Sequence, residues 1–208
     1  MTTGLLLACS APEEKQFAGL RRLMLRLAAE SRGLVHWDWR GQPLDFRRRR
    51  SLALVLVSGH GSREQAAFRG PRGALTPEML RLPRRARLYL LGCHQGRSEL
   101  RKAWAAGTGL AERRVRGHDG ETESAFSTCL LLHLLEAGLS GMDHWFSAWQ
   151  RCNAGLEGHF ALLRVAYADS GGDALRAWEK VRGLPALAPH RDFLSAALRH
   201  PEYLAGLA

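Results

Sequence analysis

The sequence predicts an α/β fold, with a mainly parallel sheet that carries helices on both faces. In the first half of the 208-residue chain, short apolar runs alternate with longer segments whose apolar residues recur at helical spacing. One of these runs, residues 51–57, is apolar throughout, as is typical of a central parallel strand covered on both faces. Beyond about residue 120 the spacing becomes helical, so the second half is expected to add helices rather than strands.

The expected elements follow one another along the chain. The first apolar run, residues 4–9, is expected to be a strand, and residues 13–30 a helix with its apolar residues on one side. Partial alternation places the second strand at residues 34–39, and apolar runs place the third and fourth at 51–57 and 86–91. A fifth strand is expected around residues 113–117. Helical spacing places the later helices at residues 99–106, 123–136, 142–153, 156–168, 174–181 and 192–200.

Proline and glycine interrupt the segment between the third and fourth strands. The interrupting residues are Pro71, Gly73, Pro77 and Pro83. Because these residues break regular structure, we expect at most one short helix in this segment, near Glu78–Leu80.

Length and composition set the expected domain organisation. The apolar fraction of 46% is ordinary for a globular protein, and 208 residues suffice for one domain with a full core. We expect a core over residues 1–165 and a helical C-terminal extension over residues 166–208 that packs on the same domain. No run approaches the ~20 apolar residues of a membrane-spanning helix. The first apolar run also lacks the basic start of a signal peptide, so we expect no membrane contact and a cytoplasmic location.

The formal net charge of +10 comes mainly from arginine, which is densest at Arg47–Arg50. Such a balance is compatible with a nucleic-acid partner. However, no aromatic residue interleaves with the run, as a stacking platform for bases would require. We therefore favour a solvated loop and keep nucleic acid as the alternative.

Four cysteines are present, and none forms a Cys-x-x-Cys pair. Neither a zinc knuckle nor a disulfide framework is expected. Three of them, Cys9, Cys129 and Cys152, lie in apolar or aromatic segments and are interpreted as core residues. Only Cys93 has different surroundings.

Two apolar strands end in a similar way. The third expected strand runs into Ser58-Gly59-His60-Gly61, and the fourth into Gly92-Cys93-His94-Gln95-Gly96. In an open parallel sheet, ligands bind beyond the carboxyl ends of the strands. If the two strands are neighbours, His60 and Cys93 emerge side by side, where an imidazole can activate a thiol as a nucleophile. The backbone N–H groups of Gly61 and Cys93 could then hold a developing oxyanion.

These motifs resemble the caspase-like superfamily, which includes caspases, metacaspases, CHAT domains, separases and gingipains. Its members place His-Gly after one core strand and a nucleophilic cysteine after the next. The stretch Cys93–Gly96 is most similar to the metacaspase Cys-His-Ser-Gly, and residues 107–117 with 123–138 resemble the fifth strand and next helix of bacterial CHAT-like members. The resemblance covers roughly residues 1–165 and implies a caspase-like open, mainly parallel sheet flanked by helices.

The chain also departs from the family pattern. His60 and Cys93 are 33 residues apart, fewer than the ~50 of caspases. Leu91 and Gly92 precede Cys93, where caspases have Gln-Ala and metacaspases have an aspartate two residues before the cysteine. The usual indication of the primary specificity pocket is therefore missing.

The resemblance implies a cysteine endopeptidase that acts on a protein substrate, without a cofactor. Cys93 would attack the peptide carbonyl, and His60 would handle the protons. Small bacterial members often serve as effectors that cleave a partner on a signal, including pore-forming gasdermins in antiviral defence. An activating partner is therefore part of the expectation.

The residue preferred before the cut is less well specified by the sequence. Acidic residues near the pocket walls, Asp119 and Glu121, would suit a basic side chain, and Asp38 could serve the same purpose. Acidity at a helix N-terminus is an ordinary alternative for Glu121. The many arginines could instead form a pocket for an acidic side chain.

Other functions give weaker accounts of the pattern. A metal site built from His60, Cys93 and His94 has no carboxylate or second cysteine at ligand spacing, so no metal is expected. Glutamine amidotransferases of class I and α/β-hydrolases place the nucleophile before the histidine, the reverse of this order. The remaining alternative is a catalytically silent adaptor that keeps the fold and binds a protein or nucleic acid through its basic surface.

Overall fold

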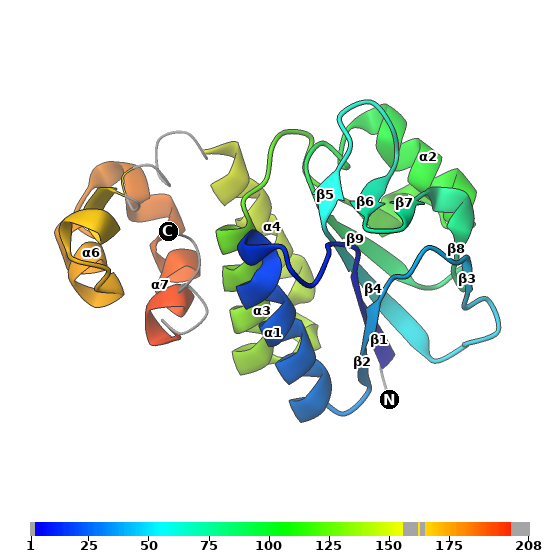
Figure 1. The fold of residues 1–208 in the computed structure, drawn as a ribbon, viewed down its shortest axis with the longest axis horizontal. Helices are drawn as coiled ribbons and strands as arrows, with labels where there is room; N and C mark the ends of the chain where they lie inside the picture. The colour runs from blue at the N-terminus through cyan, green and yellow to red at the C-terminus, as the bar shows by residue number, and fades with distance from the viewer. Residues whose placement is uncertain (1–2, 156–161, 163–164, 201–208) are drawn as a thin grey trace. The chain divides into compact units, whose positions relative to one another are not determined.

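The computed structural model describes residues 3–155, 162 and 165–200 (Figure 1). Contacts within the chain separate it into two compact units, Met1–Thr122 and Glu123–Ala208. The first unit contains the strands, and the described part of the second unit is helical. These units divide the chain after Thr122, whereas the boundary expected from the sequence, between residues 165 and 166, lies inside the second unit.

The first unit is built around a five-stranded sheet in which every pairing is parallel. The strands lie in the order β10-β9-β4-β1-β2. Their bounds are Thr3–Ala8 (β1), Leu34–Asp38 (β2), Leu52–Ser58 (β4), Arg87–Leu91 (β9) and Val115–Arg116 (β10). The five strands expected from the sequence are all present, and the α/β class with a mainly parallel sheet is confirmed.

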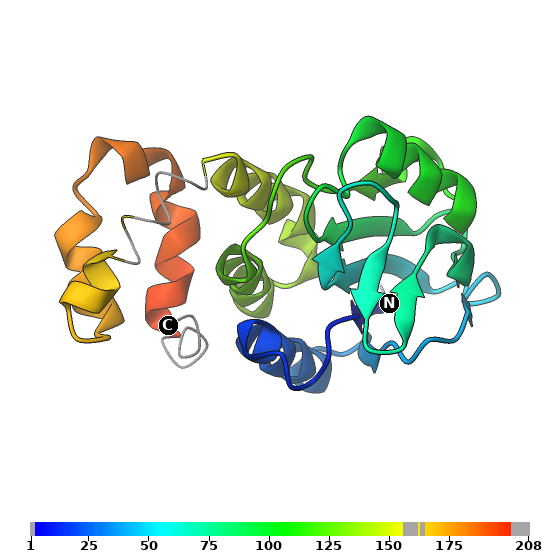
Figure 2. The same cartoon turned by 45° about the horizontal axis from the view of Figure 1, so that its top comes forward.

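Helix α1 (Lys15–Glu30) and helix α2 (Ser98–Thr108) cover opposite faces of this sheet (Figures 1 and 2). On one face, Leu7 and Val57 share a core with Trp104 of α2. Successive side chains of a strand point to opposite faces, so Leu6 points to the other face, where α1 packs against β1 and β2. Both faces are buried, which is why the central strands are apolar without alternation.

The connection from β4 to β9 differs from the sequence expectation. The one short helical segment expected near Glu78–Leu80 is present as a 3₁₀ turn, but the connection also holds a three-stranded antiparallel sheet in the order β5-β6-β7 and one further strand, β8. The bounds are His60–Gly61 (β5), Phe68–Gly70 (β6), Gly73–Leu75 (β7) and Leu80–Arg81 (β8), with a 3₁₀ turn, η1, at Pro77–Met79. β8 pairs with β3 (Leu44–Asp45), which was also unexpected. Strands of two or three residues are too short to show a periodic pattern, so only tertiary pairing reveals them.

The described part of the second unit contains helices α3, α4, α6 and α7, close to their expected positions. Their bounds are Ser124–Ala137 (α3), Met142–Ala154 (α4), Ala174–Val181 (α6) and Arg191–Arg199 (α7). Much of the helix expected over residues 156–168 lies outside the described residues, although residues 165–169 are helical. Shorter 3₁₀ turns, η3 (Leu139–Gly141) and η4 (Pro185–His190), precede α4 and α7.

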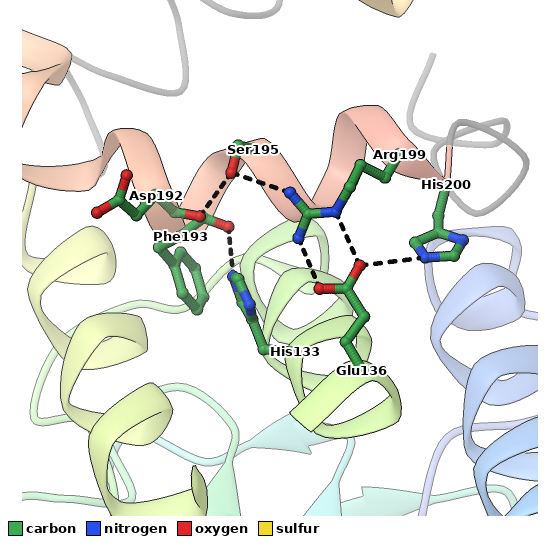
Figure 3. A network of polar contacts seen from close by, with 7 residues as sticks. All are labelled: His133, Glu136, Asp192, Phe193, Ser195, Arg199 and His200. Atoms are coloured by element: carbon green, nitrogen blue, oxygen red, sulfur yellow. Dashed lines mark hydrogen bonds and ion pairs between the residues drawn. The ribbon is translucent and has the colours of Figure 1, made fainter. Parts of the chain in front are cut away.

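Polar contacts join α3 to α7 inside the second unit (Figure 3). Arg199 donates to both carboxylate oxygens of Glu136, at 2.8 and 2.6 Å. The buried ring of His133 bonds through Nε2 to the carbonyl oxygen of Phe193 at 2.9 Å and stacks on Trp145. Burial is the main reason why the pKa of His133 is lowered. A neutral, hydrogen-bonded ring is thus part of the packing between these helices.

Candidate functional site

The carboxyl ends of β4 and β9 lie side by side. The two strands pair in parallel, and their register puts Ser58 opposite Leu91. His60 follows Ser58 by two residues, and Cys93 follows Leu91 by two residues. The neighbouring arrangement on which the sequence argument depended is therefore present.

The two loops beyond these strand ends are in direct backbone contact. A methyl group built on Gly61 would lie 2.2 Å from the carbonyl oxygen of Cys93 and 2.8 Å from its nitrogen. A methyl group on Gly92 would lie 2.9 Å from the carbonyl oxygen of Gly59. Both positions need glycine because any larger residue would force backbone apart from backbone. This close approach brings the loop that carries His60 against the loop that carries Cys93.

A buried glutamine ties the same two loops together. Gln95 is 0% exposed, and its Nε2 donates to the carbonyl oxygen of Ser62 at 2.7 Å. Its Oε1 accepts a hydrogen bond of 2.7 Å from the indole of Trp104 on α2. Because buried polar groups need partners, this side chain fixes the turn after Cys93 to both neighbours. Sequence reasoning included Gln95 in the motif without assigning it a role.

Cys93 differs from the other cysteines in its exposure. All four are free thiols, but Cys9, Cys129 and Cys152 are buried, whereas Cys93 is partly exposed. Burial raises the pKa of Cys9 well above its usual range and that of Cys152 to about 12. A thiol must be accessible to react with a molecule from solution, so among these four Cys93 is the one suited to do so.

The sulfur of Cys93 contacts Thr122. The backbone N–H of Thr122 points to Sγ at 3.4 Å, and Oγ1 of Thr122 lies 3.6 Å from the same sulfur. A backbone N–H directed at sulfur can stabilise negative charge there. Thr122 is a residue of the site that the sequence did not indicate.

The turn that follows Cys93 is held in an unusual backbone conformation. Among the described residues, His94 is the one non-glycine residue with a positive φ, 64°. Its N–H donates to the carbonyl oxygen of Gly120 at 2.7 Å, and its Nδ1 lies 3.3 Å from the carbonyl oxygen of Asp119. These contacts attach the loop after β10 to the turn. They also give His94 a structural role beside the site. Non-glycine residues held in this conformation cluster at functional sites.

The ring of His60 is paired with a carboxylate from a third loop. Its Nε2 lies 2.7 Å from Oε2 of Glu14, the residue that precedes α1. Oε1 of the same carboxylate accepts a hydrogen bond of 2.7 Å from the N–H of Ala11, and the ring of Phe17 meets the imidazole edge-on. Sequence reasoning missed Glu14. The only signal was its position just after β1, at the same edge of the sheet.

Topology explains why these three loops meet. Counted in chain order, the five strands of the sheet run 2-1-3-4-5, so the chain leaves β1 in one direction for β2 and returns on the other side at β4. Ligands of doubly wound sheets bind at such a switch point, outside the carboxyl ends of the strands. Glu14 follows β1 and His60 follows β4, the two strands that flank the switch point. Cys93 follows β9, the next strand along.

The three acidic residues considered for a substrate pocket lie in different places. Asp119 and Glu121 belong to the loop after β10 that is attached to the turn after Cys93, and the side chain of Asp119 is 80% exposed. Asp38 ends the edge strand β2 and accepts hydrogen bonds from both Nε and Nη2 of Arg21. Its charge is therefore already compensated, and β1 separates its strand from β4. Asp119 and Glu121 are brought to the site, and Asp38 is not.

A separate cleft of about 340 Å³ opens beside Asp38. Its lining residues are His36, Trp37, Asp38, Arg40 and Gln42. They belong to β2 and the segment after it, so this cleft is distinct from the loops that carry His60 and Cys93.

The arginine run is exposed over its whole length, Arg47–Arg50. Arg47 pairs with Asp45, and its hydrogen bonds lower the pKa of that carboxyl group to about 2. The other three guanidinium groups of the run add positive charge to the surface of the first unit.

Searches against protein-family models and against curated proteins found no match to this chain. Within the described ranges, no group of three His, Cys, Asp or Glu side chains could hold a metal ion. None of the helices described is both long enough and apolar enough to cross a membrane.

Proposed function

We propose that this chain is a cysteine endopeptidase in which His60 and Cys93 act together at the carboxyl ends of β4 and β9. The observation that carries the proposal is the contact between their loops, where a methyl group on Gly61 would fall 2.2 Å from the carbonyl oxygen of Cys93. Partial exposure of Cys93, and the burial of the other three cysteines, support the same assignment.

The reaction needs one base, one nucleophile and an oxyanion site. His60 takes the thiol proton, and Sγ of Cys93 attacks the carbonyl carbon of the peptide bond. The C–N bond then breaks, and the amine leaves with the proton that His60 held. Water, deprotonated by the same histidine, hydrolyses the thioester and regenerates the thiol. The N–H groups of Gly61 and Cys93 are the proposed oxyanion donors because they belong to the two touching loops.

The proposed substrate is a partner protein cleaved in the cytoplasm, in response to an activating partner. Asp119 and Glu121 favour a basic side chain before the cut, since both acids lie in the loop attached to the turn after Cys93. The further expectation of a bacterial defence effector that activates a gasdermin-like pore former rests on the resemblance to the caspase-like superfamily.

Activity-based labelling tests the dyad. Acyloxymethyl ketone peptides with either a basic or an acidic residue before the reactive group should label the protein, and mass spectrometry should locate the adduct on Cys93. His60→Ala should abolish most of the labelling, while His144→Ala, which removes an exposed histidine from α4, should not. A peptide library cleaved by the parent, but not by Cys93→Ala, would then identify the preferred residue. Labelling that survives His60→Ala would contradict the dyad.

The exposed arginine run supports a second candidate, a catalytically silent adaptor that binds a protein or nucleic acid. Binding of DNA or RNA should then fall steeply with salt, and Arg48→Ala with Arg49→Ala should weaken it. Binding of this kind, together with no labelling at Cys93 under any condition, would favour the adaptor over the peptidase.

A further inference from the structure

We propose that Glu14 is a positioning residue that holds His60 in the one tautomer able to accept the proton of Cys93. This inference rests on the proposed peptidase and extends its dyad by a third group. The geometry is a distance of 2.7 Å between Oε2 of Glu14 and Nε2 of His60. No motif points to this pairing, because the two residues are 46 positions apart and come from different strand ends.

The carboxylate decides which ring nitrogen carries the proton. An ionised carboxylate only accepts hydrogen bonds, so Nε2 of His60 must donate to Glu14. A neutral imidazole has one N–H, and the lone pair therefore lies on Nδ1. Nδ1 becomes the nitrogen that takes the thiol proton. When the ring is then positively charged, the carboxylate 2.7 Å away stabilises the charge.

Glu14 is itself held in place, as a positioning residue requires. The N–H of Ala11 donates to its Oε1 at 2.7 Å, and its own N–H donates to the carbonyl oxygen of Ala11 at 3.1 Å. The aromatic ring of Phe17 restricts the imidazole from another side, with ring centres 4.9 Å apart and planes at 88°. Glu14 and Phe17, which both contact the imidazole, thus belong to the segment that joins β1 to α1 and to the first turn of that helix.

The Glu14–His60 contact is not needed to attach α1 to the sheet. Arg21 of the same helix pairs with Asp38 of β2, and the apolar side of the helix is buried along its length. The Glu14 and His60 side chains are 30% and 43% exposed, so water screens their attraction and limits its effect on stability. Removing the carboxylate should therefore change the chemistry of His60 much more than the fold.

Glu14→Gln is the sharpest test because it keeps the shape of the side chain and reverses the direction of its hydrogen bond with Nε2 of His60. The amide oxygen of Gln would accept from Ala11, so its NH₂ group would face Nε2 of His60 and force the proton to Nδ1. We expect kcat for a cleaved peptide to fall by about 10²- to 10⁴-fold, as for a triad histidine in the wrong tautomer, with KM changed less than about threefold. Glu30→Gln, which removes the Arg26–Glu30 ion pair from the same helix, is the matched control and should keep kcat.

Two further measurements separate positioning from a structural role. In ¹⁵N-histidine NMR spectra, His60 should be the Nε2–H tautomer in the parent and move towards Nδ1–H in Glu14→Gln. In Glu14→Ala, added formate should restore part of the lost kcat, whereas chloride at equal ionic strength should not. A parent ring in the Nδ1–H form, or a kcat for Glu14→Gln within about threefold of the parent, would overturn the proposal.

The tautomer measurement does not depend on activity. If no substrate is cleaved and Cys93 is never labelled, the peptidase fails, while the spectrum still decides whether Glu14 sets the tautomer. If Cys93 and His60 are essential but Glu14→Gln is fully active, the dyad stands and the positioning role of Glu14 is overturned.

Discussion

The amide nitrogen of Gln95 donates a hydrogen bond to the carbonyl oxygen of Ser62 at 2.7 Å, across 33 positions of sequence. The bond joins the turn after Cys93 to the loop after His60, and the Gln95 side chain that donates it is fully buried. The orientation of the Gln95 amide is also fixed by Trp104, whose indole N–H donates a hydrogen bond to Oε1 of the same side chain. The relative placement of the two candidate catalytic loops is therefore set partly by a buried amide.

Replacing Gln95 by leucine should be strongly destabilising. The change leaves the buried indole N–H of Trp104 and the carbonyl oxygen of partly buried Ser62 without this partner. Each buried group left unsatisfied costs about 1–3 kcal/mol, so we expect a loss of about 2–4 kcal/mol. Urea denaturation measures it, and Gln65→Ala in the same loop, where the side chain is exposed, should change stability by less than about 0.5 kcal/mol. Equal effects of the two substitutions would contradict the role given to Gln95.

Gly61→Ala should reduce both stability and activity. The added methyl group would lie 2.2 Å from the carbonyl oxygen of Cys93, so one of the two loops must move. Overpacking of this kind costs about 1–3 kcal/mol, and the movement would also misplace the proposed oxyanion donors. Gly183→Ala is the matched control, since a methyl group there meets no atom within 4 Å. Thermal unfolding and labelling of Cys93 should both respond to the first substitution and not to the second.

The four cysteines should differ sharply in reactivity. At pH 8, iodoacetamide should modify Cys93 of the folded protein, and the other three thiols only after denaturation, because they are buried. A thiol with a pKa of about 12, such as Cys152, is ionised only to about one part in 10⁴ at that pH. Peptide mapping by mass spectrometry identifies the modified residue, and Cys93→Ser should abolish the fast reaction. Rapid modification of Cys9 or Cys152 in the folded state would be incompatible with this structure.

The free energy of unfolding should fall as the pH is lowered through the range where histidine titrates. Burial, the largest cause, lowers the pKa of His133 in the folded state, whereas an unfolded histidine titrates near ~6.5. The unfolded chain then binds the proton more readily. The contribution of the neutral ring is therefore complete above pH ~6.5 and is lost as the pH falls towards the lower folded-state pKa.

The contribution of His133 can be isolated by substitution. Urea titrations at pH 7 and pH 5 should show a smaller pH dependence for His133→Gln than for the parent. His144→Gln, at an exposed position whose charge is only a lesser cause of the lowered pKa of His133, should reduce the pH dependence less than His133→Gln does. Buried His36 and His118, whose pKa values burial also lowers, should keep part of the dependence in both variants. A parent protein that becomes more stable at pH 5 would show that the sign is wrong.

Local pattern was sufficient for most regular elements. Mainly apolar runs of six or seven residues identified the four longer strands, and helical spacing identified α1, α2, α3 and α4 to within a few residues of their ends. Local pattern did not reveal β3 and β5 to β8, because strands of two or three residues are too short to show an alternation of apolar and polar residues. Their positions depend on pairing with segments elsewhere in the chain.

The sequence by itself determined which residues could carry the chemistry, and tertiary structure decided what surrounds them. Two apolar runs that end in Gly-His-Gly and Gly-Cys identify His60 and Cys93, since the carboxyl end of a strand is predictable from the run before it. Only the fold made β4 and β9 neighbours, excluded Asp38 from the site and brought in Glu14 and Thr122. The physical reason is that a hydrogen bond between residues 46 positions apart depends on strand order and backbone approach, which local periodicity does not encode.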